Sequence, residues 1–119
     1  MSDSMKSDNL LQEGFKKICD VIELKNNQGK RFIVDNVDVA IFKVDSEVFA
    51  LSNICPHKLS ALIFDGMIED GCVVCPVHGW MFNLKTGKRP DGTQGIDSYP
   101  VKFLNDEVYV KVFPKKFNW

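Results

Sequence analysis

A chain of 119 residues, 45% hydrophobic and 26% charged, has the composition of one ordinary globular domain, which excludes a disordered or fibrous protein. Its 15 basic and 16 acidic residues leave a formal net charge of −1, so we expect no nucleic-acid partner. No apolar run approaches the roughly 18 residues of a transmembrane helix, and residues 1–9 are polar, unlike a signal peptide. We therefore expect a soluble cytoplasmic protein with no membrane partner.

Turn signals recur about every eight to twelve residues, a spacing typical of an all-β sandwich or barrel. The polar residues 1–13 are expected to be flexible. The segments predicted next along the chain are a strand over 15–21, a turn over 26–29, a strand over 31–34 and a hairpin over 37–52.

A second hairpin is predicted near the C-terminal end, with strands over 99–104 and 108–112. Its valines alternate with lysines, and the alternation places Phe103 with the valines on the inner face and Tyr109 with the lysines on the outer face. We therefore expect an antiparallel pair that is buried on one side.

Residues 54–88 differ from the rest of the chain, because they hold three of the four cysteines and both histidines. We expect one domain over 1–119, in which this segment is inserted into a β base formed by 14–53 and 89–119. In a cytosolic chain disulfides are rare, so metal or redox chemistry is the expected use of these cysteines.

Two short Cys/His motifs carry that chemistry: Cys55-Pro56-His57 and Cys75-Pro76-Val77-His78. A hairpin turning at Asp70-Gly71 lies between them and can bring the two motifs side by side. Two thiolates and two imidazoles can bind one zinc ion, but the single residue between Cys55 and His57 makes it hard for both to ligate the same ion. Two irons relax this constraint, because each motif can supply one ligand to each iron, as in a Rieske [2Fe–2S] centre.

At these residues the chain resembles Rieske-type iron–sulfur proteins, and the order of β base, ligand loops and β base is similar as well. The resemblance implies an all-β fold: a Rieske-like antiparallel β-sandwich base with an inserted small cluster-binding β-hairpin subdomain. It implies a [2Fe–2S] cluster whose buried iron is ligated by Cys55 and Cys75. The outer iron would be ligated by His57 and His78.

The residues around the ligands have expected supporting roles. Pro56 and Pro76 would stiffen the loops, and Gly79 would let the backbone approach the cluster. Trp80 would pack beneath the cluster. The residues expected to surround the exposed imidazoles are Pro56, Lys58, Pro76 and Val77.

The resemblance also implies a branch of the family. Respiratory Rieske proteins carry a further cysteine in each loop, where this chain has Ser60 and Val77. They place hydroxyl groups near the cluster, where this chain has Trp80 and Phe82. Fewer hydrogen bonds to the cluster predict a potential toward the lower end of the Rieske range of about −150 to +300 mV.

The low-potential branch implies a soluble one-electron carrier that passes electrons from a reductase to an oxygenase or another terminal enzyme. The chain would not itself be an enzyme, since both histidines are used by the cluster and none is left for a catalytic iron. The alternative is the small Rieske subunit of an NAD(P)H nitrite reductase, bound to its large subunit. A more distant alternative is a zinc-binding interaction module.

Two further cysteines are expected to be buried apolar residues. Cys72 forms a C-x-x-C pattern with Cys75, but this spacing in a strand sends the two side chains to opposite faces, which argues against a redox dithiol. Cys19 is expected to be a small core residue in the same way.

Overall fold

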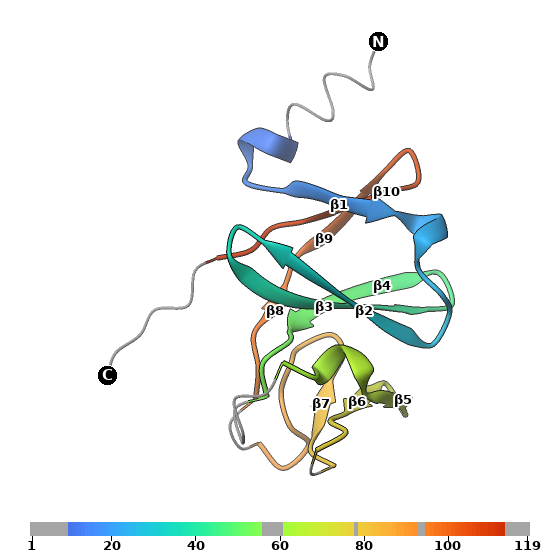
Figure 1. Cartoon of the computed structure of the whole chain (residues 1–119), viewed down its shortest axis with the longest axis vertical. Coiled ribbons are helices and arrows are strands. Elements are labelled where there is room, and N and C mark those ends of the chain that lie inside the picture. The colour runs from blue at the N-terminus through green and yellow to red at the C-terminus, as the bar shows by residue number, and fades with distance from the viewer. Residues whose placement is uncertain (1–9, 56–60, 78, 93–94, 114–119) are drawn as a thin grey trace.

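Three antiparallel sheets make up the described part of the chain, which comprises residues 10–55, 61–77, 79–92 and 95–113 of the computed structural model. This arrangement confirms the all-β fold class (Figure 1). The terminal sheet has the order β1-β10-β9, the central sheet β2-β3-β4-β8 and the small sheet β5-β6-β7. The bounds of the strands are β1 Lys16–Asp20, β2 Gln28–Val34, β3 Val37–Val44, β4 Glu47–Ser52, β5 Met67–Glu69, β6 Cys72–Val74, β7 Met81–Asn83, β8 Ser98–Tyr99, β9 Val101–Leu104 and β10 Glu107–Val110. Two short 3-10 helices, η1 (Val21–Glu23) and η2 (Ile63–Asp65), lie between strands.

Tight turns build the hairpins, and polar residues supply the left-handed backbone that such turns need. Asp35 and Asn36 between β2 and β3 have φ of 49° and 66°, and Asp70 and Gly71 between β5 and β6 have φ of 50° and 77°. Two consecutive positive φ angles are the mark of a type I′ turn, which matches the twist of a β-hairpin. The predicted Asp70-Gly71 hairpin is confirmed, with Glu69 opposite Cys72.

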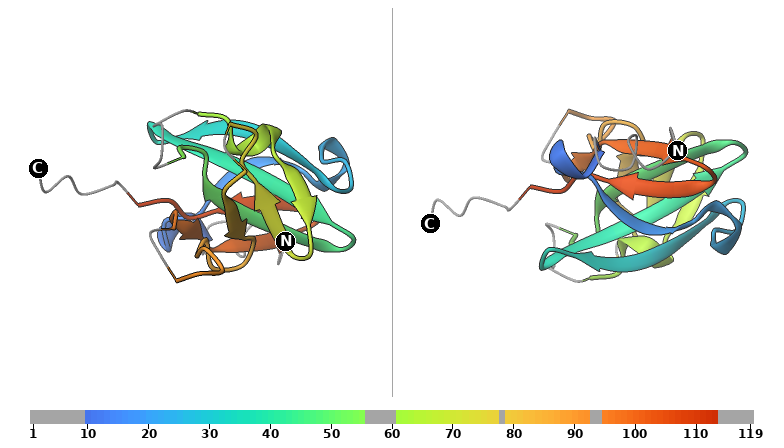
Figure 2. Two further views of the ribbon diagram at one scale, coloured as in Figure 1. Left: turned by 90° about the horizontal axis from the view of Figure 1, so that it is seen from below. Right: turned by 90° about the horizontal axis from the view of Figure 1, so that it is seen from above.

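The first core lies between the terminal and central sheets, which stack as two layers (Figure 2). It is mostly aliphatic, as expected for two sheets that bury one face each. Its fully buried members come from both sheets: Val108 and Val110 from β10, and Val39 and Ile41 from β3.

The central sheet is buried on both faces, and β3 shows this most clearly. Val39 and Ile41 point into the first core, whereas the alternating Ala40 and Phe42 point into a second core that the sheet shares with the small sheet. The central sheet therefore separates two cores, and it supports the small sheet at the lower end of Figure 1.

The predicted strand over 31–34 and the predicted hairpin over 37–52 are confirmed with small shifts. β2 begins at Gln28, so it includes the second half of the turn predicted over 26–29. β4 begins at Glu47. The predicted strand over 99–104 is divided at Pro100, which cannot donate a ladder hydrogen bond. As a result β8 belongs to the central sheet and β9 to the terminal sheet.

The register of the last hairpin places Phe103 on the face of the valines and Tyr109 on the face of the lysines, as predicted, but the predicted burial is wrong for both residues. Phe103 is 49% exposed although Val108 opposite it is buried, because β9 is the edge strand of the terminal sheet. Tyr109 is 3% exposed. Its cross-strand neighbours are Lys17 and Lys102, whose long alkyl stems can cover the ring while their charges stay in water.

Among the described residues, no helix has the length and apolar character needed to cross a lipid bilayer.

Candidate metal centre

Cys55 and Cys75 enter the same buried cluster of side chains from two different sheets. Cys55 lies just beyond the end of β4 in the central sheet, and Cys75 directly follows β6 in the small sheet. Cys55 is 2% exposed and Cys75 is 1% exposed, and both pack in the second core with Phe82. The structure therefore brings together two sulfur donors that the chain separates by the first loop and the β5–β6 hairpin.

The other predicted ligands, His57 and His78, lie outside the described residues, as do Pro56 and Lys58. Among the residues that are described, no three metal-ligating side chains converge. The donors that are described fit the predicted group, since thiolates are the ligands that iron–sulfur clusters require.

The loop that begins at Cys75, which we call the second loop, is closed by hydrogen bonds within its own backbone. The Cys75 N–H donates to the Trp80 carbonyl at 2.7 Å, and the Gly79 N–H donates to the Cys75 carbonyl at 2.9 Å. Gly79 has a φ of 74°, a left-handed conformation that favours glycine. Pro76 and Val77 are exposed at the tip. The result is a tight loop in which Cys75 is buried while the tip at Pro76 and Val77 is exposed.

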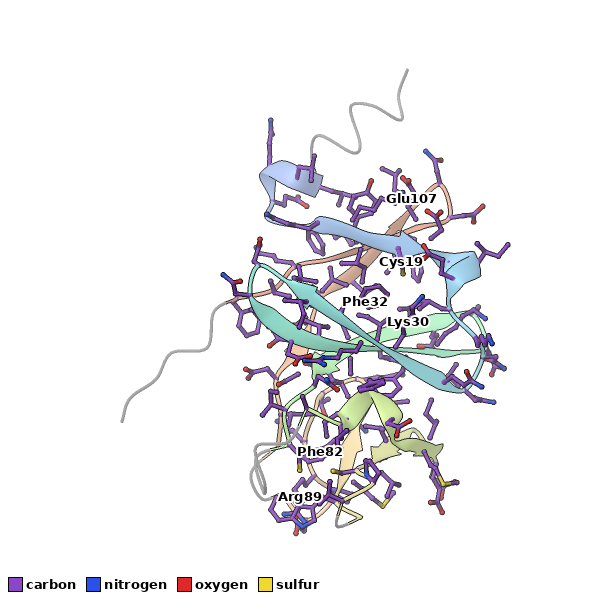
Figure 3. All side chains as sticks on the ribbon, in the orientation of Figure 1. Cys19, Lys30, Phe32, Phe82, Arg89 and Glu107 are labelled. Carbon is purple, nitrogen blue, oxygen red and sulfur yellow. The ribbon has the colours of Figure 1, made fainter. Side chains whose placement is uncertain are left out.

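Trp80 follows this loop and is covered by an arginine from the chain after β7. The Arg89 guanidinium carbon lies 3.7 Å from the centre of the Trp80 ring, a cation–π contact. The Arg89 side chain is 19% exposed and lies 3.9 Å from the Asp91 carboxylate. Trp80 packs against the second core, and Phe82, which is labelled in Figure 3, is fully buried in it.

The predictions for the remaining cysteines are confirmed. Cys19 is 3% exposed and Cys72 is 8% exposed. Burial raises the pKa of the Cys19 thiol from 9.0 to about 11, and burial also raises the pKa of Cys72. Both are therefore neutral thiols near pH 7. Val73 and Cys75 point into the second core, while Cys72 is not part of it, as alternation along β6 requires.

The family model of the Rieske-like [2Fe-2S] domain matches residues 14–111. A relative in Photorhabdus laumondii, the ferredoxin subunit of 3-phenylpropionate/cinnamic acid dioxygenase, is 36% identical over 98 residues, which is 80% of this chain and 91% of the relative. The anthranilate 1,2-dioxygenase ferredoxin subunit of Burkholderia cepacia is 34% identical over 62% of this chain and 69% of its own length.

Solved structures show the same fold. The Sphingomonas yanoikuyae B1 ferredoxin has a TM-score of 0.71 at 28% identity, over 82% of this chain and 97% of its own. The nitrite reductase [NAD(P)H] small subunit of Erwinia carotovora has a TM-score of 0.73 at 21% identity, over 87% and 85%.

The chain therefore belongs to the Rieske-like [2Fe-2S] family. Its cofactor is a Rieske [2Fe–2S] cluster, and its role is that of a ferredoxin, which carries electrons. Its resemblance to dioxygenase ferredoxin subunits extends over most of both chains.

Proposed function

We propose that this chain is a cytoplasmic one-electron carrier that takes electrons from a reductase and delivers them to an oxygenase. It has no catalytic site of its own in this proposal. The observation that carries it is the burial of Cys55 and Cys75 in one core at the end of the molecule, beneath a second loop in which Pro76 and Val77 are exposed. A cluster held there would have one iron inside and one near the surface, where a partner protein can approach.

We propose Cys55 and Cys75 as ligands of the inner iron and His57 and His78 as ligands of the outer iron. When bound, the cluster accepts and releases one electron reversibly. The chain contributes the rest: the second core excludes water from the sulfur ligands, and the hydrogen bond from the Cys75 N–H to the Trp80 carbonyl fixes the backbone of the second loop. In this proposal residues 54–88 bind the cluster, and 14–53 with 89–119 form the base of one domain.

Metal analysis of the purified protein tests the cofactor assignment against the zinc alternative. We expect two irons and two acid-labile sulfides per chain, a brown colour and a Rieske-type EPR signal on reduction. A colourless protein that contains zinc would overturn the proposal. Replacing any one of Cys55, His57, Cys75 and His78 by alanine should abolish the spectrum, whereas the matched control Cys72→Ala should keep it. A spectrum that survives the loss of a proposed ligand would refute that ligand.

The acceptor is the second part of the proposal. The relatives named above are subunits of dioxygenase systems, which favours an oxygenase. The similarity to the Erwinia carotovora small subunit, at 21% identity, carries the fold alone. Affinity purification of the native protein separates the two: a transient partner and a monomeric carrier are expected, and a stable complex with a large flavoprotein subunit would establish the nitrite reductase alternative instead.

The proposed reduction potential depends on the residues that come after the second loop. Phe82 is fully buried in the second core and Trp80 is covered by Arg89, and neither can donate a hydroxyl hydrogen bond to the cluster. We expect a midpoint potential in the lower part of the Rieske range of about −150 to +300 mV. Protein-film voltammetry measures it, and a value near the upper end would refute this reasoning.

A further inference from the structure

Asn53 stands out because it is a polar side chain with no exposed surface, in a part of the described chain where the buried residues are otherwise apolar. It lies after the end of β4 and two residues before Cys55. Its backbone N–H donates to the carbonyl of Asp38 at 2.9 Å, and its Nδ2 donates to Oδ1 of Asp38 at 3.0 Å. Asn53 is therefore attached to the central sheet by both its backbone and its side chain.

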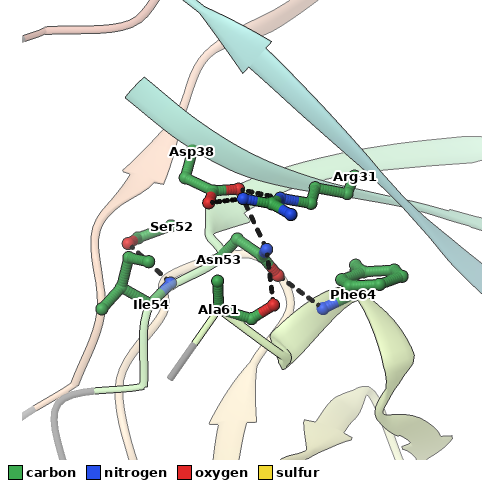
Figure 4. A network of polar contacts seen from close by, with 7 residues as sticks. All are labelled: Arg31, Asp38, Ser52, Asn53, Ile54, Ala61 and Phe64. Atoms are coloured by element: carbon green, nitrogen blue, oxygen red, sulfur yellow. Dashed lines mark hydrogen bonds and ion pairs between the residues drawn. The ribbon is translucent and has the colours of Figure 1, made fainter. Parts of the chain in front are cut away.

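Both polar atoms of the Asn53 side chain also bond to the chain that follows the first loop (Figure 4). Its Nδ2 also donates to the Ala61 carbonyl at 3.1 Å, and its Oδ1 accepts from the Phe64 N–H at 2.7 Å. Its backbone carbonyl accepts from the Ile63 N–H at 3.3 Å. Asn53 directly precedes residues 54–60 and is bonded to the chain that follows them, so it joins the two ends of the first loop. We call this junction, residues 53 and 61–64, the neck of the loop.

Asp38, which anchors Asn53, is itself held by a two-point ion pair. Nε of Arg31 donates to Oδ1 of Asp38 at 2.9 Å, and Nη2 donates to Oδ2 at 2.7 Å. The Asp38 side chain is 15% exposed and that of Arg31 is 48% exposed. Paired geometry of this kind fixes the orientation of the carboxylate as well as its position. The series Arg31, Asp38, Asn53 therefore connects the rigid central sheet to the neck of the loop.

A second contact holds the same neck against the sheet. Gly29 in β2 lies so close to the Phe64 carbonyl and the Phe42 ring that a Cβ at this position would overlap both. The chain after the loop is thus packed onto β2 on one side and bonded to Asn53 on the other. A ligand loop whose two ends are fixed in this way loses little entropy when its cysteine binds a metal.

We propose that Asn53 is a positioning residue for the cluster: it holds the neck of the first loop so that the Cys55 thiolate is presented to the inner iron. This inference rests on the proposed role of Cys55 as a ligand. Buried hydrogen bonds resist breaking because the groups released are left without water. The neck should therefore stay closed while the cluster is bound, and the cluster should be lost slowly.

The test is the rate at which the cluster-loaded protein loses its visible absorbance in the presence of an iron chelator. Asn53→Leu keeps the size of the side chain and removes all of its hydrogen bonds. We expect it to bleach about tenfold faster or more, because several buried bonds are lost. Hydrogen exchange of the peptide covering 53–64, measured by mass spectrometry, should rise in the same variant.

Val108→Ala is the matched control, because it destabilises the first core far from the loops. Each protein is measured at the denaturant concentration that gives it the same free energy of unfolding. Under these matched conditions Val108→Ala should bleach at the wild-type rate. Equal bleaching rates for Asn53→Leu and Val108→Ala would overturn the proposal, since Asn53 would then act through overall stability alone.

Arg31→Gln keeps the proposal testable if Asn53→Leu does not fold, because the exposed Arg31 can be replaced without opening the core. We expect it to bleach about two- to fivefold faster, in line with the loss of one partly exposed ion pair. Its control is Lys16→Gln, which breaks a single, more exposed ion pair of 2.9 Å with Asp35. Equal rates for these two variants would also overturn the proposal.

Cys55→Ala separates this inference from the proposed function. A Cys55→Ala protein that still binds the cluster refutes the ligand assignment, whatever Asn53→Leu does. A Cys55→Ala protein without a cluster, together with wild-type bleaching of Asn53→Leu, refutes the positioning role alone.

Discussion

The two cores on either side of the central sheet are enclosed by very different amounts of regular structure. The first core lies between the central sheet and a terminal sheet whose strands have four or five residues each. The second core is covered by a small sheet whose three strands have three residues each, together with η2 and the loops. The small sheet has few backbone hydrogen bonds of its own, so it depends on side chains for its stability.

The side chains of the second core show how that dependence is met. Phe42 and Leu51 reach across from the central sheet, and Phe82 meets them from β7. Cys55 and Cys75 complete the same cluster. The end of the molecule that holds Cys55 and Cys75 therefore depends on a few large aromatic side chains, whereas the first core depends on many small aliphatic ones.

Phe82→Ala should have the largest effect, because it removes the large side chain that the small sheet contributes to the second core. We expect the free energy of unfolding to fall by about 3–5 kcal/mol, together with loss of the cluster during purification. Chemical denaturation and iron content measure the two effects. A variant that is destabilised but still fully loaded would contradict the dependence of the cluster on this core.

Val108→Ala is the matching change in the first core. Removing two methyl groups from a fully buried position should cost about 2 kcal/mol of unfolding free energy. The visible and EPR spectra of the remaining folded protein should be unchanged, since Val108 lies in the terminal sheet and not in the second core. A changed spectrum would show that the two cores are coupled through the central sheet.

Alkaline pH should weaken the first core through Cys19. Because burial raises the pKa of Cys19 in the folded protein from 9.0 to about 11, the unfolded chain loses this proton at lower pH than the folded one. Stability from the buried neutral thiol is fully present below about pH 9 and is lost as pH rises through about 11. Chemical denaturation of the wild type and of Cys19→Ala, at about pH 8 and about pH 10.5, measures this loss of stability. An equal decline in both proteins would contradict this assignment.

Arg89→Gln should have the smallest effect, confined to the end of the molecule where Arg89 covers Trp80. Loss of the cation–π contact with Trp80 should cost about 0.5–1 kcal/mol, whereas Arg89→Lys, which keeps the charge, should cost less. Thermal unfolding followed by tryptophan fluorescence detects the difference. If both variants match the wild type, the contact contributes nothing to the stability of this end.

The site was predictable to the extent that its signals are local. The Cys55-Pro56-His57 and Cys75-Pro76-Val77-His78 motifs stand within a few residues each, and their spacing indicated the cofactor that the family match supports. Asn53 and Arg89 carried no such signal. Each acts on a segment distant in sequence or in a separate loop, so its partner is visible only after the chain has folded.

By itself, the sequence determined the all-β class, the hairpin turns and the two Cys/His motifs, because backbone conformation at Asp, Asn and Gly and alternation of side chains are short-range effects. Tertiary structure alone decided that β3 serves two cores, that Pro100 divides a strand between two sheets, and that Tyr109 is buried while Phe103 is not. Those outcomes depend on which sheet covers which face, and that choice is made by packing between residues far apart in the chain.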